Sequence, residues 1–410
     1  MIAELYNLFL MDTSYPMFPK RRDSKPVPRS PRDRGPAHFF HGRKEIIDDF
    51  SIILDDAKVL KDGTTFLIQG APGVGKTALI DVLAKQAREN GWKAVDIFPN
   101  ALWNPVELIG RLNLKKILPK ISGASAEVSV GDAASATISI DFDHPAETIL
   151  KILSAQKKPL LLILDEAQSL GKPKIVPDEM KGITASVLKQ IHNGDLGKSV
   201  MFIAGGLGTT EHTLNTFSVS LFEGDCRVYL GRLSPASERA VIKDWLTHVT
   251  GGNPATPTWI DAIAERTHGW PQHIMSYVKP AVKYLRANNR DMTDASLETV
   301  LARGDQLRLK YYDGRAHDID ERGRIALAQS VLDVSIDSTT TQEAVIASLQ
   351  KSGFSKKESK DLFECALDQG ILDKCGHGRY GIPIPSMHKW LKDNYGNDRG
   401  KADCRFSMER

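Results

Sequence analysis

The stretch TTFLIQGAPGVGKTALIDVLAKQARENGW, residues 64–92, decides the fold. Residues 65–69 form a short apolar run, which is typical of a buried strand. GAPGVGKT, residues 70–77, matches G-x-x-x-x-G-K-[ST] in full. A helix is predicted to start at Lys76, with Gly91 as its C-terminal stop. A strand, a glycine-rich loop and a helix in this order predict a phosphate-binding loop.

The residue types in this loop suit the binding of a nucleotide. Glycines let backbone N–H groups approach phosphate oxygens, and the start of the following helix favours an anion. Lys76 would place a cation at the β- and γ-phosphates, where it assists catalysis, and Thr77 would bind Mg²⁺ through its hydroxyl. The predicted nucleotide-binding residues are Gly70, Ala71, Pro72, Gly73, Val74, Gly75, Lys76 and Thr77.

A second motif, LDEAQ at residues 164–168, ends an apolar run that begins at residue 159. Such a run followed by a carboxylate is typical of a buried parallel strand. Asp165 is predicted to hold Mg²⁺ through water, and Glu166 to act as the catalytic base toward the attacking water. The alternative for Glu166 is a solvated surface acid. The Asp-Glu pair favours ATP hydrolysis over phosphorylation of a small molecule.

Strands and helices are expected to alternate through the first half of the chain, which predicts an α/β fold with a parallel sheet. The expected strands are 65–69, 93–98, 159–165, 199–204 and 227–230, with helices at 105–118 and 182–192 and a β-hairpin insertion at about 126–142.

The second half of the chain is expected to be mainly helical. Ser234 caps a helix with Pro235 at its first position, and Ser355 with Glu358 forms a capping box for another. Ile325, Ala328 and Leu332 are expected on one helical face. Three helices and a hairpin then predict a winged helix-turn-helix. The predicted parts are a basic arm (1–38), an ATPase core (39–233), a helical lid (234–313), a winged-helix domain (314–395) and a tail (396–410).

Composition fits a multidomain globular protein of 410 residues, with 41% hydrophobic and 26% charged residues. No apolar run is long enough for a transmembrane helix, and the N-terminus lacks the basic region of a signal peptide. Four cysteines without CxxC spacing are read as reduced thiols, so a cytoplasmic location without membrane contact is expected. Residues 19–36 carry a net charge of +5, whereas the whole chain carries +3. This proline-rich arm is either a solubilising tail or a segment that contacts phosphates.

Five motifs together resemble those of AAA+ and STAND ATPases, in the branch related to origin recognition. They are FHGRKE (40–45), GAPGVGKT, LDEAQ, THGWPQHI (267–274) and GRYGIPIPSMHKWL (378–391). The resemblance implies that Gly42 and Arg43 lie beside the adenine and ribose, and that Pro271 packs on the nucleotide from the lid. It also implies an arginine finger, Arg227, acting across a subunit interface in a self-associated form. The alternative for Arg227 is a surface salt bridge.

Two positions depart from this family pattern. The strand that should end in a polar sensor residue ends in AGGLG (204–208), and Thr209 and Thr210 come late. After Pro271, where the family has an arginine, this chain has Gln272 and His273. His273 could contact a phosphate or pack within the lid. Both departures predict slow hydrolysis, which suits a switch better than a motor.

The charges of the predicted winged helix do not decide whether it contacts DNA or protein. Basic residues that could contact DNA are mixed with acidic ones, and winged helices also bind proteins. The sequence therefore favours a nucleotide-controlled, DNA-associated switch in a mobile-element, replication or defence setting. The alternative is a signalling or scaffold module that senses a protein partner. A helicase fits poorly because the later helicase motifs are missing. The residues concerned are Lys356, Lys357, Lys360, His377 and Arg379, against Glu358, Asp361 and Glu364.

Overall fold

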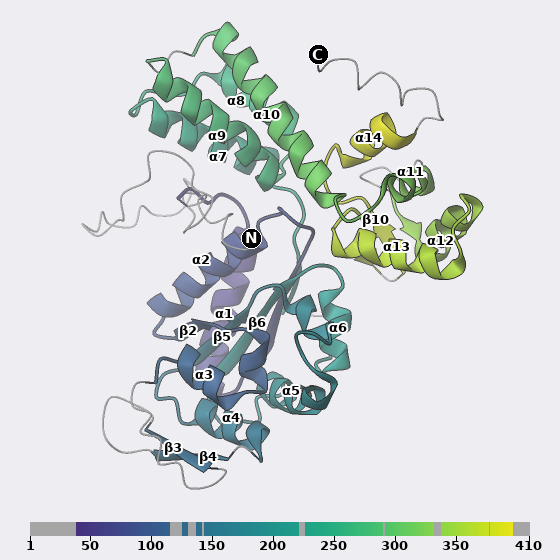
Figure 1. The fold of residues 1–410 in the computed structure, drawn as a ribbon. Coiled ribbons are helices and arrows are strands. Elements are labelled where there is room, and N and C mark those ends of the chain that lie inside the picture. Colours follow the sequence, from purple (N-terminus) through teal and green to yellow (C-terminus); the bar gives the residue numbers. More distant parts are fainter. Residues whose placement is uncertain are drawn as a thin grey trace. The chain divides into compact units, whose positions relative to one another are not determined.

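The computed structural model describes residues 38–114, 125–129, 137–141, 143–220, 226–289, 292–331, 338–376 and 378–396. These residues form two compact units, which are described one at a time (Figure 1). The first consists of Gly42–Gly70 and Gly75–Leu230. The second contains Gly231–Arg410 and the tip of the phosphate loop, Ala71–Val74, together with the described residues up to His41. Residues 1–37 of the predicted basic arm and residues 397–410 of the predicted tail, with Cys404, lie outside the described residues.

A five-stranded parallel sheet forms the centre of the first unit, with the strand order β2-β5-β6-β1-β7. Its register places Leu67 beside Ala204 and Leu162 beside Phe202. All five strands were expected from the sequence, and the α/β fold with a parallel sheet is confirmed. The strands are β1 (Thr65–Gln69), β2 (Lys93–Asp96), β5 (Leu160–Leu164), β6 (Val200–Gly206) and β7 (Arg227–Tyr229).

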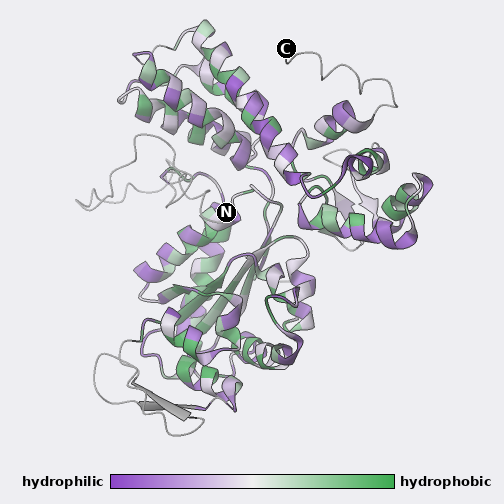
Figure 2. Ribbon diagram, in the orientation of Figure 1, coloured by the Kyte–Doolittle hydropathy of each residue, from purple (hydrophilic) through white to green (hydrophobic). Residues whose placement is uncertain are grey.

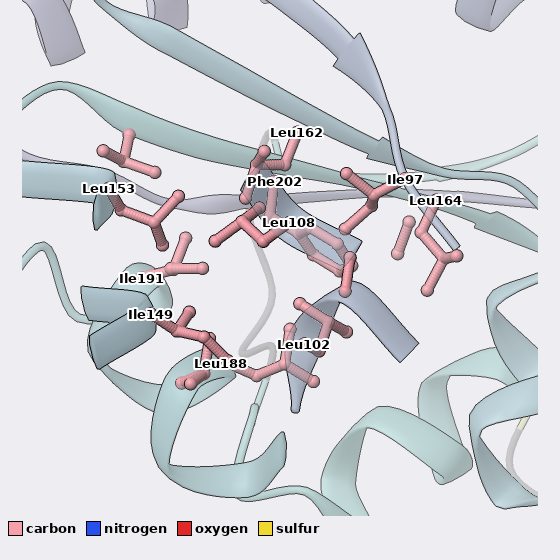
Figure 3. Close-up of a cluster of buried hydrophobic side chains, with 14 of the residues drawn as sticks. Ile97, Leu102, Leu108, Ile149, Leu153, Leu162, Leu164, Leu188, Ile191 and Phe202 are labelled. Carbon is pink, nitrogen blue, oxygen red and sulfur yellow. The ribbon is translucent and has the colours of Figure 1, made fainter. Parts of the chain in front are cut away.

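Helices cover both faces of this sheet (Figure 1). On one face, Phe50 from the first helix packs edge-on against Phe66 of β1, with 5.1 Å between ring centroids. On the other face lies the apolar cluster drawn in Figure 3, which takes Leu160, Leu162 and Leu164 from alternate positions of β5. The helices are α1 (Lys44–Leu60) and α2 (Lys76–Glu89) on the first face, and α3 (Pro105–Arg111), α4 (Pro145–Ser154), α5 (Asp178–His192) and α6 (Thr210–Thr216) on the second.

Hydropathy follows this arrangement. All residues of β1, β5 and β6 are buried, so these strands are largely apolar rather than alternating (Figure 2). The surface helices are amphipathic: α4, for example, buries Ile149, Ile152 and Leu153 and exposes Lys151. The continuous apolar run predicted from residue 159 is therefore a central strand.

The expected hairpin insertion is present as two antiparallel strands, β3 (Ser125–Ser129) and β4 (Thr137–Asp141). Their register pairs Val128 with Ile138. The turn predicted between them lies outside the described residues.

Three predicted boundaries were wrong. The helix expected at 105–118 ends at Arg111, because the chain turns at Asn113, which has a left-handed φ of 51°. The strand expected at 93–98 ends at Asp96, since Pro99 begins a short 3-10 helix, η1 (Pro99–Leu102). The helix expected from residue 182 begins at Asp178, where two acidic residues in the first turn favour the helix N-terminus.

Four helices come first in the part of the second unit that follows the sheet. As predicted, the Ser234 hydroxyl accepts a hydrogen bond from the N–H of Ser237 and caps the first of them. The fourth helix continues through Gly314 to Arg315, and the domain boundary expected at residue 314 stays a prediction. These helices are α7 (Pro235–Val249), α8 (Pro257–Thr267), α9 (Pro271–Ala287) and α10 (Asp294–Arg315).

Further helices and a small sheet follow α10. The predicted capping box is present, since Ser355 and Glu358 exchange both hydrogen bonds. Of the residues expected on one helical face, Ala328 is buried and Ile325 is 38% exposed. Leu332 and His377 lie outside the described residues. The elements are α11 (Glu321–Ser330), α12 (Gln342–Lys351), α13 (Lys356–Asp368), α14 (Met387–Leu391) and a three-stranded sheet of β8 (Thr340–Thr341), β10 (Arg379–Gly381) and β9 (Asp373–Gly376).

Across the described ranges, no helix has the length and apolar character needed to cross a membrane. The three cysteines in these ranges, Cys226, Cys365 and Cys375, are free thiols.

Candidate nucleotide-binding site

The predicted site lies at the carboxyl edge of the parallel sheet. The phosphate loop follows β1, Asp165 follows β5, and Gly206 ends β6. Since β1 and β5 both pair with β6 in parallel, their ends meet at one edge. In open α/β sheets this edge is where ligands bind.

Glycine conformations shape the loop where it enters α2. Gly75 caps the helix with a φ of 96°, a left-handed conformation that side chains disfavour. The Gly70 N–H donates to the Gly206 carbonyl at 3.2 Å, which ties the start of the loop to β6. Lys76 is buried, and its Nζ donates to the Gly70 carbonyl at 2.7 Å. The Lys76 ammonium therefore lies against the phosphate loop, as the sequence predicted.

The loop tip, Ala71–Val74, groups with the second unit and makes its contacts there. The Gln272 N–H donates to the Gly73 carbonyl at 3.1 Å, and the Tyr311 hydroxyl to the Pro72 carbonyl at 2.8 Å. Pro271, which precedes Gln272, is buried and is the first residue of α9. Its predicted contact with the nucleotide stays a prediction.

Thr77 and Asp165 come together as the predicted magnesium-binding pair. The Thr77 hydroxyl donates to Asp165 Oδ2 at 2.6 Å, while Oδ1 accepts the N–H of Glu166 at 3.0 Å. A hydroxyl and a carboxylate are the hard oxygen ligands that Mg²⁺ prefers, and its remaining ligands are commonly water and phosphate. The described residues contain no cluster of three or more His, Cys, Asp or Glu that could hold a metal. The pair therefore fits Mg²⁺ that takes its remaining ligands from water and a nucleotide.

Glu166 has a left-handed backbone, with φ 57° and ψ 40°. This conformation is uncommon for a residue with a side chain and costs about 1 kcal/mol or more. It marks a sharp turn directly after the strand. The Glu166 carboxylate accepts a hydrogen bond from the side-chain amide of Gln168.

Sequence reasoning missed the role of Gln168, although it is the last letter of the LDEAQ motif. The Gln168 carbonyl oxygen accepts from the N–H of Leu207 at 3.3 Å and from the hydroxyl of Thr210 at 3.4 Å. A β-carbon at Gly206 would lie 2.1 Å from Thr210 Oγ1 and 2.3 Å from Gln168 Oε1. The unexpected glycine at the end of β6 therefore makes room for this pair.

Gly42 and Arg43 directly precede α1, and Arg43 is its N-cap residue. Both have left-handed backbones, with φ values of 82° and 63°. Burial lowers the pKa of Arg43 to about 10, so the side chain stays charged at neutral pH. Their predicted place beside the base and ribose stays a prediction.

Arg227 forms an ion pair within its own chain, with 2.9 Å between its Nη2 and Glu211 Oε2. This is the salt-bridge alternative that the sequence left open, and a finger acting across subunits stays a prediction. His273 is fully buried, with its ring edge-on to those of Tyr311 and Tyr312. Burial lowers its pKa to about 3, so it is neutral at physiological pH. Both observations favour packing for His273 over a phosphate contact.

Asp81 is a second residue that the sequence analysis did not single out. It lies on α2, one turn after Thr77, and one of its carboxylate oxygens is buried. Burial, with the negative charges of Asp96 and Asp165, raises the pKa of Asp81 to about 7. The carboxyl group therefore opposes folding when it is ionised.

The pH dependence of folding stability tests whether ionised Asp81 opposes folding. Because the folded-state pKa of Asp81 lies above its usual value, the folded chain binds more protons and loses stability as pH rises from about 4 to about 7. Asp81→Asn removes this loss. Without nucleotide or divalent cations, we expect the stabilisation by Asp81→Asn to be about 1 kcal/mol larger at pH 8 than at pH 5.5, after allowance for solvent screening. Thermal unfolding at both pH values measures it, and an equal gain at both would contradict the shifted pKa.

Comparisons with known proteins agree with this geometry. Residues 40–179, about a third of the chain, match the family model of the AAA ATPase domain. No curated protein matches the chain. Among solved structures, the ORC2 protein of Aeropyrum pernix in its ADPNP–ADP complexes is 14% identical, with a TM-score of 0.51, and the match covers 86% of this chain and 93% of that one. The Walker-type ATPase PABY2304 of Pyrococcus abyssi is 15% identical, with a TM-score of 0.48 and coverage of 86% and 95%. Residues 40–179 are therefore similar to the AAA ATPase domain, and the chain has the P-loop ATPase fold of the ORC2 protein.

Proposed function

We propose that the chain is a nucleotide-controlled switch that binds ATP with Mg²⁺ and hydrolyses it slowly. One observation carries this proposal: the Thr77 hydroxyl lies 2.6 Å from Asp165 Oδ2, and Glu166 follows directly at the same strand end. The solved ORC2 structure, which shares this fold, contains ADPNP and ADP.

Each group of the site has a separate task in this reaction. Lys76 and the N–H groups of the loop bind the phosphates, and the start of α2 adds a positive dipole end. Thr77 and Asp165 would hold Mg²⁺, which supplies charge neutralisation at the β- and γ-phosphates when bound. Glu166 accepts a proton from the attacking water as the water oxygen bonds to the γ-phosphorus. The bond from the γ-phosphorus to the bridging oxygen breaks, and ADP leaves.

Phosphate release from ATP by the purified full-length chain, with Mg²⁺ and with a chelator, tests this proposal. Release that depends on Mg²⁺ and disappears in both Lys76→Ala and Glu166→Gln supports it. Release that persists in both variants would assign the activity to another protein.

DNA association is the second part of the proposal, and basic groups of the second unit support it. Lys356 and Lys357 are exposed in the first turn of α13, and Arg379 is exposed on β10. The order of three helices and a hairpin in this region supports a winged helix as the part that would contact DNA. The arm at residues 19–36 adds seven basic side chains.

Salt dependence separates the arm from the winged-helix region. Each phosphate contact releases counterions, so log K falls with log salt by about 0.9 per contact on duplex DNA. If four to seven arm residues engage, we expect a slope of about −4 to −6 for the full chain. Deletion of residues 1–36 should flatten the slope, and Arg379→Ala should weaken what remains. Fluorescence anisotropy with a labelled duplex measures both effects. No binding at low salt, with or without ATP, would remove the DNA part of the proposal.

A protein partner is the alternative, and a specific contact favours it. On α13, Lys360 lies 3.8 Å from Glu364, so part of the positive charge of this helix is paired. Glu358 and Asp361 add further negative charge to the same helix. In this case the chain would remain an ATP-binding switch, and the region from α11 onward would contact protein.

A further inference from the structure

We propose that Gln168 is the positioning residue for Glu166, and that the loop after β6 holds Gln168 in place. The inference rests on the proposed ATP hydrolysis, because it concerns the same carboxylate. It adds a residue to which no role has been assigned.

Hydrogen bonds at both ends of its amide fix the Gln168 side chain. Its NH2 group donates to the Glu166 carboxylate, and its carbonyl oxygen accepts from the Leu207 N–H and the Thr210 hydroxyl. An amide held by its oxygen has little freedom to turn its NH2 group away. The carboxylate is consequently oriented by a group that is itself anchored, which is the arrangement of a base and its orienting partner.

The anchoring loop is in turn fixed to the phosphate loop. The Gln69 side-chain amide, at the end of β1, donates to the Gly208 carbonyl at 3.0 Å and to the Leu207 carbonyl at 3.4 Å. The next residue, Gly70, donates its N–H to the Gly206 carbonyl. A continuous set of hydrogen bonds therefore runs from the start of the phosphate loop to the catalytic carboxylate.

Gly206 supports this assignment independently. Its missing β-carbon is what allows Gln168 and Thr210 to approach the strand end, because a β-carbon there would overlap both side chains. The strand end itself carries no polar side chain, since Gly205 and Gly206 are its last two residues. The polar group that faces Glu166 comes instead from Gln168, with Thr210 behind it.

Two substitutions at Gln168 distinguish orientation from packing. Gln168→Ala removes the amide, and Gln168→Glu keeps its size but replaces the donated hydrogen bond with a second negative charge. We expect both to lower kcat about 10-fold while KM for ATP changes less than twofold. If Gln168 only fills space, kcat should fall in the alanine variant alone, because glutamate fills the same space.

Thr210→Val should lower kcat about threefold and add nothing to Gln168→Ala, since the hydroxyl acts only through the glutamine. Thr209→Val is the matched control: this threonine lies one residue earlier and is partly exposed. It should keep wild-type kcat.

The outcomes separate this inference from the proposed function. If Glu166→Gln abolishes turnover while both Gln168 variants keep kcat, hydrolysis stands and the inference is wrong. A second measurement does not need turnover: the Tm losses of Glu166→Ala and Gln168→Ala should be less than additive in the double variant, because the two side chains contact each other. Additive losses would overturn the contact that carries the inference.

Discussion

Glu166→Gln should keep ATP bound and lose at least about 10²-fold in turnover, which is the usual contribution of a positioned general base. Glutamine has the shape of glutamate, so residue 166 can keep its left-handed turn and can still accept the hydrogen bond from the Gln168 amide. The neutral amide, however, cannot accept a proton from water. Phosphate release at saturating ATP measures the loss, and the ATP-dependent rise in Tm measures retained binding.

Glu179→Gln provides the matched control for this experiment. Glu179 is an exposed acid in the first turn of α5, and the substitution makes the same change of charge at a residue outside the predicted nucleotide-binding set. It should leave turnover unchanged. Full activity in Glu166→Gln would move the base to another group, and equal loss in both variants would point to net charge.

The sequence predicted the central sheet well because each strand has a local signal. β1 is followed by an unmistakable glycine loop, and β5 is a continuous apolar run that ends in Asp165. These patterns depend only on neighbours along the chain. One prediction was wrong where the local signal was weaker. The helix expected at 105–118 ends at Arg111, because the left-handed backbone of Asn113 turns the chain.

The site was predictable to the same extent, and for the same reason. Thr77 and Asp165 could be paired from motifs, because carboxyl ends of parallel strands meet at one edge. Gln168 and Thr210 could not be paired in this way, since their contact depends on the three-dimensional path of the loop after β6. The raised pKa of Asp81 likewise depends on which carboxylates fold close to it. Contacts between residues far apart in the sequence are therefore what the structure adds.

Arg227 and His273, two side chains that could act on a phosphate, make other contacts in this structure. Arg227 pairs with Glu211 in its own chain, and His273 is neutral and packed between tyrosines. Neither side chain stands free as a cation toward a phosphate in this structure. Lys76 is consequently the cation on which nucleotide binding should depend most.

Lys76→Ala should abolish most of the stabilisation that ATP gives to the wild-type chain. A ligand that binds only the folded state stabilises it by RT ln(1 + [L]/Kd), or about 2.7 kcal/mol at a hundredfold excess over Kd. Because loss of the cation weakens phosphate binding, the same ATP concentration should raise the Tm of the variant far less. Each protein must be compared with itself without ATP, since the variant also loses the hydrogen bond from Lys76 to the Gly70 carbonyl, worth about 1 kcal/mol. Lys85→Ala, an exposed lysine on the same helix α2, is the control and should respond to ATP like the wild type. If Lys76→Ala gains as much as Lys85→Ala, the phosphates bind elsewhere, and the assignment of residues 70–77 as the nucleotide-binding loop is wrong.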